Sequence, residues 1–295
     1  MSDADGFVLL VNRAAGSSED AVIDQVALLL RTAGHEVEIR ACGHPDDVDD
    51  VVATVGDRTL VVCGGDGSLH LAVGRLRSAG RLDVAVGLIP LGTGNDFARA
   101  VGIPLDDAGA AVEHLLASDP RPMDLLVGGD DRACVNALHL GLGATAAARA
   151  DAMKDSLDDL AYPLGAILAG LTAGGTQMRV EVDGEVVADG QTLLVAVCNG
   201  TGFGGGARIA PDADPADGLL DVVVAQATGP LARAAFGLAL QRGTHLERED
   251  VHLARGRRVV IEGEDLRDDV DGELGEPGAA TPAWQVDAGA WRFAG

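Results

Sequence analysis

The chain has 295 residues, of which 47% are hydrophobic and 23% are charged, so it is long enough to form two ordinary globular domains with buried cores. Its formal net charge is −24, and Lys154 is the only lysine. This charge argues against general nucleic-acid binding, and it weakens, without excluding, contact with an anionic membrane surface.

The cysteines and apolar segments indicate a cytoplasmic protein. The cysteines lie far apart in the sequence and form neither a CxxC pair nor a Cys/His cluster, so we expect reduced core residues instead of zinc ligands. The N-terminal "MSDADGFVLLVN" has no basic region followed by a long apolar stretch. The most apolar later segment, "YPLGAILAGLTAGG", is shorter than the roughly 20 residues of a membrane span.

The first third of the chain alternates apolar runs with amphipathic patterns. Apolar runs at 7–12, 36–42, 59–63 and 84–90 predict strands. Helices are predicted between them: over 17–34 with a Ser17/Asp20 capping box and Gly34 as the stop, from Pro45, from about Ser68, and through 106–118. Repeated βα units predict a doubly wound domain with a parallel sheet covered on both faces.

From about residue 125 the pattern changes to paired strands. Alternating residues predict strands over 124–127, 133–141, 178–190 with a turn at Asp183-Gly184, 192–200, 218–227, 251–263 and 283–293. An Ala-rich, partly helical segment at about 144–173 interrupts them. We therefore expect a nucleotide-binding α/β domain over residues 1–125 and an antiparallel β-sandwich over 126–295, with the option that the last residues pack back on the first domain.

A glycine-rich turn, "GGDGS" at 64–68, follows the strand 59–63 directly. In a parallel sheet, ligands bind beyond the carboxyl ends of strands, and backbone N–H groups at a helix N-terminus can face a phosphate. Glycines that simply permit a tight turn remain the alternative. Asp66 is the unusual member, because a carboxylate beside a phosphate requires an intervening cation, which favours magnesium or a proton-transfer role.

A second turn, "LGTGNDFARA", follows the next strand and places Thr93, Asn95 and Asp96 at the same edge of the sheet. Neither GxxxxGK[ST] nor GxGxxG spacing occurs at these turns. Two glycine turns with carboxylates at adjacent strand ends favour a ligand site over turn chemistry alone.

The motifs resemble the diacylglycerol kinase catalytic domain family, which includes diacylglycerol, sphingosine and ceramide kinases and bacterial soluble lipid kinases. The pieces occur in the family's order: "VNRAAG", "GGDGS", "PLGTGNDFAR", Asp124, "FGGGARIAPDADPADGLLD" and "VDGE" at 270–273. NAD kinases also carry a GGDG turn, but they do not follow it with "GTGNDFAR". The resemblance implies two domains with a cleft between them and transfer of the γ-phosphate of ATP to a lipid hydroxyl.

The resemblance also implies site residues. Nucleotide contacts would come from Asn12, Gly64, Gly65, Asp66, Gly67, Ser68, Thr93 and Asn95, and a catalytic Mg²⁺ network from Asp66, Asp96 and Asp124. Asp271 would be the general base, assisted by Glu273, with Asp66 also catalytic. Asp214, Asp217 and Leu219 would hold a structural Mg²⁺. "VDGE" occurs twice, and order in the chain assigns catalysis to Asp271 and an ordinary hairpin turn to Asp183.

Three departures from the family pattern affect the nucleotide side of the site. Arg13 and Ala15 stand where the family has proline and serine, and Leu71 stands where the family has a glutamate after the GGDG turn. A regulator that binds nucleotide or lipid without catalysis, and an NAD-kinase-like enzyme, therefore remain alternatives. The expected partner is a membrane lipid, met transiently at the bilayer surface; the identity of this acceptor and the oligomeric state, with a homodimer as one option, stay open.

Overall fold

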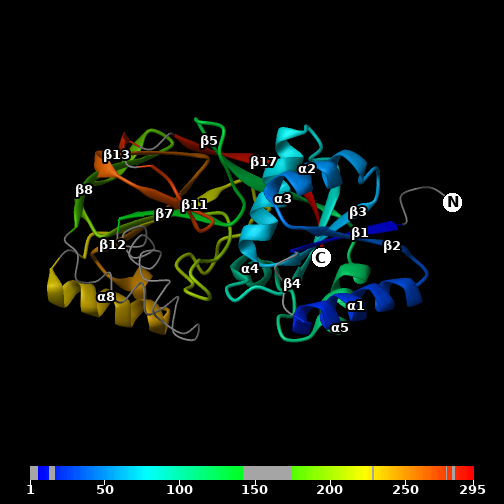
Figure 1. Cartoon of the computed structure of the whole chain (residues 1–295). Coiled ribbons are helices and arrows are strands. Elements are labelled where there is room, and N and C mark those ends of the chain that lie inside the picture. The colour runs from blue at the N-terminus through cyan, green and yellow to red at the C-terminus, as the bar shows by residue number, and fades with distance from the viewer. Residues whose placement is uncertain (1–5, 13–16, 142–174, 228, 277, 281–282) are drawn as a thin grey trace. The chain divides into compact units, whose positions relative to one another are not determined.

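The computed structural model describes residues 6–12, 17–141, 175–227, 229–276, 278–280 and 283–295. The chain divides into two compact units (Figure 1): unit 1 comprises Met1–Asp124 and Gly289–Gly295, and unit 2 comprises Leu125–Ala288. The chain passes between them within two strands, β5 (Arg121–Gly128) and β17 (Trp284–Ala294). The partly helical segment predicted at 144–173 lies outside the described residues.

Unit 1 is the predicted α/β domain with a parallel sheet. Its strand order is β2-β1-β3-β4-β17, and the end of β17 pairs parallel to β4. Helices cover both faces, with α2 and α3 on one side and α1 and α5 on the other (Figure 1). The elements are β1 (Gly6–Asn12), α1 (Ser17–Thr32), β2 (Glu36–Cys42), α2 (Pro45–Thr54), β3 (Thr59–Gly64), α3 (Asp66–Ser78), β4 (Ala85–Pro90), α4 (Asp96–Val101) and α5 (Ala108–Ala117).

Unit 2 is the predicted antiparallel sandwich. One sheet contains β13, β8 and β9, and the other has the order β12-β11-β10-β7-β14-β15. Leu138, Val180, Val222 and Trp284 belong to the fully buried core that both sheets contribute to. The elements are β6 (Ala133–Cys134), β7 (Ala137–Gly141), β8 (Thr176–Val182), β9 (Glu185–Thr192), β10 (Leu194–Cys198), β11 (Leu220–Ala225), α8 (Pro230–Arg242), η2 (His245–Glu247), β12 (Val251–Gly256), β13 (Arg258–Leu266), β14 (Asp268–Val270), β15 (Glu273–Leu274) and β16 (Gly278–Ala280).

Three elements differ from the sequence-based expectations. The strand predicted over 133–141 is broken into β6 and β7, because the N–H groups of Val135 and Asn136 bind the side chain of Asp271 instead of a neighbouring strand. The strand predicted over 251–263 divides into β12 and β13, which belong to different sheets. The helix α8 was missed, although Pro230 at its first turn and Gly243 after its end are ordinary helix boundaries.

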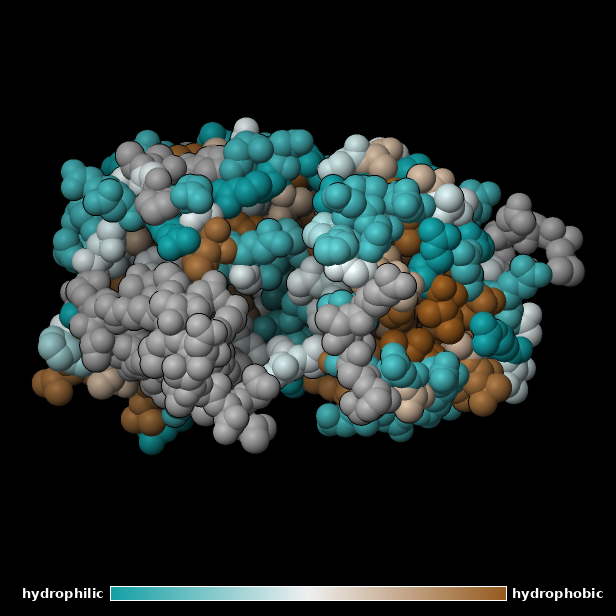
Figure 2. All heavy atoms as spheres, viewed as in Figure 1, coloured by the Kyte–Doolittle hydropathy of each residue, from teal (hydrophilic) through white to brown (hydrophobic). Residues whose placement is uncertain are grey.

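Hydrophilic residues cover most of the face shown in Figure 2, and apolar residues gather on unit 1 beside α1 and β2. The exposed apolar side chains of these two elements include Leu28 and Ile39, which are 64% and 38% exposed. Among the described residues, no helix combines the length and the apolar character needed to cross a membrane.

The Asp183-Gly184 turn joins β8 and β9 as predicted. Both residues have positive φ, 51° and 87°, which Asp and Gly tolerate better than other residues. The Asp183 carboxylate also accepts hydrogen bonds from the N–H groups of Arg257 and Arg258, at 3.1 and 2.9 Å. The side chain therefore fixes the point at which the chain changes from β12 to β13.

We expect Asp183→Ala to destabilise the protein by roughly 1–3 kcal/mol, because two backbone N–H groups lose their acceptor and alanine is strained at positive φ. Asp183→Asn should lose less stability than Asp183→Ala, since asparagine tolerates this φ and keeps one acceptor oxygen. Urea unfolding curves of the two variants measure the difference. Equal stability of the alanine variant and the wild type would contradict this account.

Candidate functional site

The two glycine turns of unit 1 lie against each other at the carboxyl ends of β3 and β4. The N–H of Leu91 donates to the carbonyl of Gly64 at 3.0 Å. A Cβ atom added to Gly92 would lie 2.5 Å from the Cα of Gly65, and one added to Gly65 would lie 3.0 Å from the Cα of Gly92. Both positions therefore need glycine because two backbones touch there.

Asp66 links the first turn to the helix that follows the second. Its two carboxylate oxygens accept hydrogen bonds from the N–H groups of Asp96 and Phe97, each at 3.0 Å, and so cap the N-terminus of α4. Asn95, in left-handed conformation with φ 51°, closes the second turn through its side chain, which binds the N–H and the carbonyl of Gly92. These two residues, predicted as ligand contacts, hold the turns in place.

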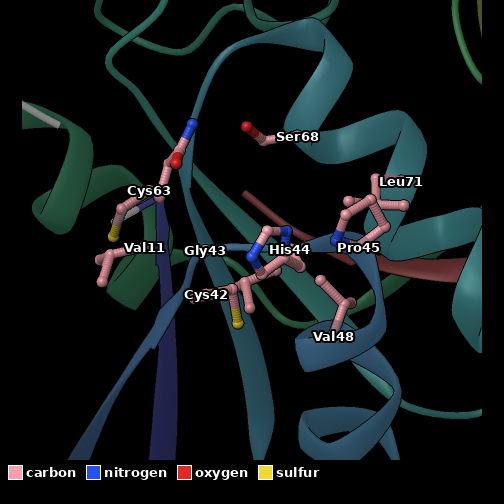
Figure 3. Close-up of a pocket in the computed structure, with 11 residues that line it drawn as sticks. Val11, Cys42, Gly43, His44, Pro45, Val48, Cys63, Ser68 and Leu71 are labelled. Atoms are coloured by element: carbon pink, nitrogen blue, oxygen red, sulfur yellow. The ribbon is translucent and has the colours of Figure 1, made fainter. Parts of the chain in front are cut away.

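A hollow of about 220 Å³ lies beside the first turn (Figure 3). It is bounded by the carboxyl ends of β1, β2 and β3 and by the first turns of α2 and α3, the edge at which a parallel sheet binds ligands. Of the predicted contacts, Asn12 and Ser68 line it; the other lining residues are Leu10, Val11, Cys42, Gly43, His44, Pro45, Val48, Cys63 and Leu71.

The β2–α2 side of this hollow was missed from the sequence. Strand pairing places it there, since β2 pairs with β1 and Cys42 lies opposite Asn12. The carboxylate of Asp47 accepts hydrogen bonds from the N–H groups of Gly43 and His44, at 2.7 and 2.9 Å, and so fixes this loop. Leu71, noted as a departure, lies on the wall with Pro45 and Val48 and makes that wall apolar (Figure 3).

Asp96 and Asp124 are buried carboxylates of unit 1, with exposures of 7% and 2%. Oδ1 of Asp124 accepts a hydrogen bond from the N–H of Gly289 at 2.8 Å. Within the ranges that the structure describes, no three His, Cys, Asp or Glu side chains lie close enough to hold one metal ion directly. Carboxylates are suitable donors for Mg²⁺, and Mg²⁺ usually keeps several waters, so these residues fit a metal held through water and not one bound by all three.

In unit 2, the carboxylate of Asp271 is held by the backbone at the break between β6 and β7. It accepts hydrogen bonds from the N–H groups of Val135, Asn136 and Ala137, at 2.6, 3.0 and 3.0 Å. Its own φ is 50°, almost the same as that of Asp183. Both copies of "VDGE" therefore form the same device, a left-handed Asp-Gly turn whose carboxylate binds another segment, and only their surroundings distinguish them.

The remaining predicted residues lie at the surface of unit 2. Glu273 is exposed at the start of β15. Asp217 accepts a hydrogen bond from the N–H of Leu219 at 2.9 Å, and its own N–H donates to the carbonyl of Asp214 at 3.3 Å, so these three residues do come together. However, the guanidinium of Arg255 pairs with Asp217 and with Asp221. It supplies the positive charge expected from a structural Mg²⁺, so the group does not fit that ion.

Known families match almost the whole chain. The diacylglycerol kinase catalytic domain matches residues 6–127, and the YegS C-terminal NAD kinase beta sandwich-like domain matches residues 136–291. A protein named probable lipid kinase YegS-like from Pseudomonas aeruginosa is 32% identical over 277 residues, which cover 88% of each chain. The chain belongs to the diacylglycerol kinase family. A diacylglycerol kinase from Mycobacterium tuberculosis is 31% identical over 232 residues, covering 75% of this chain and 72% of that protein.

Solved structures agree with this fold. A diacylglycerol kinase from Bacillus anthracis has a TM-score of 0.76 at 20% identity and covers 100% of this chain and 98% of its own. An NAD kinase from Archaeoglobus fulgidus has a TM-score of 0.55 at 11% identity, which shows a shared fold. Membership of the diacylglycerol kinase family makes this protein a lipid kinase, with ATP as the phosphate donor that such a kinase implies.

Gly92→Ala should destabilise this lipid kinase by roughly 1–3 kcal/mol, because its Cβ would overlap the backbone of Gly65. Gly74→Ala is the matched control, since Gly74 lies inside α3 with no atom within 4 Å of an added Cβ. It should stabilise the protein by about 1 kcal/mol through helix propensity. Chemical unfolding of both variants measures these changes in stability. If Gly92→Ala is as stable as the wild type, the two turns can move apart without cost.

Proposed function

We propose that this protein transfers the γ-phosphate of ATP to a hydroxyl group of a membrane lipid, with diacylglycerol as the first acceptor to test. The observation that carries this proposal is the contact between the two glycine turns beside a hollow at the strand ends of unit 1. The phosphates would lie against Gly64, Gly65, Gly67 and Ser68, at the N-terminus of α3, where the helix dipole and the first backbone N–H groups favour an anion.

The hollow next to Ser68 would receive the remainder of the nucleotide. Its walls combine apolar side chains, among them Leu71 and Val48, with the polar groups of Asn12 and His44. Such a mixture is typical of pockets that bind a flat aromatic base and a ribose. Because Leu71 offers no acceptor atom, we expect apolar contact to provide most of the affinity on this wall.

Mg²⁺ bound with ATP would neutralise charge on the phosphate oxygens during transfer. Asp66, Asp96 and Asp124 are the residues of this chain that would hold it, through water. Both oxygens of Asp66 already accept backbone hydrogen bonds, but each carboxylate oxygen has a second lone pair that a metal-bound water can use. Thr93 is exposed on the second turn and would contact a phosphate oxygen.

In the proposed reaction, the lipid oxygen forms a bond with the γ-phosphorus, the bond from that phosphorus to the bridging oxygen of ADP breaks, and the hydroxyl proton passes to Asp271. Three backbone N–H groups favour the ionised form of Asp271, which is the form able to accept a proton. Phosphoryl transfer needs positioning and charge neutralisation more than a strong base. Exposed Glu273 would assist nearby, and the acceptor would be met at the membrane surface.

We expect MgATP to protect Cys42 from iodoacetamide, because Cys42 lines the hollow and is partly exposed, whereas Cys63, Cys134 and Cys198 are buried. Burial, and to a lesser extent Asp47, raises the pKa of the Cys42 thiol above its usual value near 9, so labelling should still be accelerating with pH at pH 9 as more thiolate forms. Burial raises the pKa of the Cys63 thiol to about 12, which keeps it unreactive. Peptide mass spectrometry locates the label, with Cys42→Ser as the control.

The decisive assay incubates radiolabelled ATP with vesicles of a total bacterial lipid extract, with and without Mg²⁺. The wild type should label a lipid only with Mg²⁺. Asp271→Asn should lower the rate by about 10²- to 10⁴-fold, the usual contribution of a general base. Asp183→Asn is the matched control, because it makes the same replacement in the same kind of turn and should retain the wild-type rate. Absence of any labelled lipid, or equal rates for both variants, would refute the proposal.

A further inference from the structure

One face of the second sheet of unit 2 carries titratable side chains beside an apolar layer. Register pairs His139 on β7 with Asp269 on β14, and Asp271 follows Asp269 by two residues. Along β7, Leu138 lies in the core between the sheets, so His139 lies on the opposite face, which carries the apolar layer that includes Ala137. Asp271 follows the end of β14 in left-handed conformation, and its N–H donates to the carbonyl of Ala137 at 3.0 Å, two residues before His139. His139 and Asp269 therefore lie two residues along the paired strands from the point at which Asp271 is held.

The imidazole of His139 has an unusual environment. Its side chain is 10% exposed, and Nε2 lies 3.9 Å from Oδ2 of Asp269, whose side chain is 6% exposed. The other ring nitrogen, Nδ1, is buried and has no hydrogen-bond partner among the described residues. Burial lowers the pKa of His139, against the opposing effect of Asp269 and Asp268, so the ring is neutral at pH 7.

The neighbouring carboxylate determines which nitrogen carries the proton. A neutral imidazole has one N–H and one lone pair. The negative charge of Asp269 attracts the N–H and repels the lone pair, so the tautomer with hydrogen on Nε2 is favoured. Nδ1 is then an acceptor, and its missing partner must be a hydrogen-bond donor.

The surroundings of His139 also favour a ligand that is largely apolar apart from its hydrogen-bond donor. The ring of Phe203 lies over His139 with centroids 4.2 Å apart and is only partly buried. Phe203 packs against the apolar layer that includes Ala137 and Ala196. A ligand that combines a donor with an acyl or alkyl chain suits both features, and it would reach the imidazole by displacing the Phe203 ring.

We propose that Nδ1 of His139 binds a second hydrogen-bond donor of the acceptor lipid, distinct from the hydroxyl that reacts. This inference rests on the proposed function and narrows the acceptor class, because Asp271 receives the proton of the reacting hydroxyl. The preferred acceptor then carries a diol, a polyol or an amino alcohol, whereas a diacylglycerol offers a single hydroxyl. Asp269 is the positioning residue that fixes the tautomer.

Two probes of equal chain length test this specificity in mixed detergent micelles. 1-Monooleoylglycerol has two adjacent hydroxyls, and the monooleoyl ester of 1,3-propanediol lacks the middle one. The wild type should have a kcat/KM at least about tenfold higher for 1-monooleoylglycerol than for the propanediol ester, because one buried hydrogen bond contributes a factor of about that size. His139→Ala should remove this preference by slowing the diol alone, with the KM for ATP unchanged.

Two isosteric variants separate this role from a packing role. His139→Asn keeps a polar atom near the place of Nδ1 and should retain most of the preference, whereas His139→Gln keeps one near the place of Nε2 and should lose it. Thermal unfolding verifies that each variant is folded. An unchanged preference in His139→Ala, equal behaviour of the Asn and Gln variants, or labelling of neither ester while extract lipids are labelled would overturn this inference alone. No labelling of any lipid would overturn the proposed function as well.

Discussion

The arrangement of unit 1 depends on the direct backbone contact between Gly65 and Gly92. Because neither residue has a side chain, the ends of β3 and β4 can carry two tight turns that touch. Asp66 then reaches across and caps α4, so the second turn and its helix are fixed by the first. A larger residue at Gly92 would press on the backbone of Gly65 and so strain the turn that carries Asp66.

The carboxylates of this protein therefore do structural work as well as the chemistry proposed for them. Asp66, Asp183 and Asp271 each accept at least two backbone N–H groups from a segment distant in sequence. Such bonds fix the orientation of a carboxylate, which suits a metal network or a proton acceptor. This dual role means that loss of activity in an alanine variant needs a folding control, and asparagine is the better substitution.

In unit 2, a single sheet separates core packing on one face from the proposed lipid contact on the other. Leu138 and its neighbours on one face fill the sandwich core, whereas His139 and Asp269 share the other face with a small apolar layer. The alternation of side chains along a strand produces this division with no extra element. An unpaired imidazole nitrogen among buried groups is costly unless a ligand completes its hydrogen bonding, which connects the fold of this sheet to the choice of acceptor.

The sequence by itself determined the fold class, because the change from βα units to alternating strands near residue 125 and the motifs "GGDGS" and "PLGTGNDFAR" are local patterns. The family resemblance of these motifs also named Asn12 and Ser68, which line the hollow of unit 1. Only the tertiary structure decided what depends on contacts between distant segments: the β2–α2 wall of the hollow, the ion pair of Arg255 with Asp217, the break between β6 and β7, and the pairing of His139 with Asp269. Such contacts depend on register and on loop paths, which no local pattern encodes.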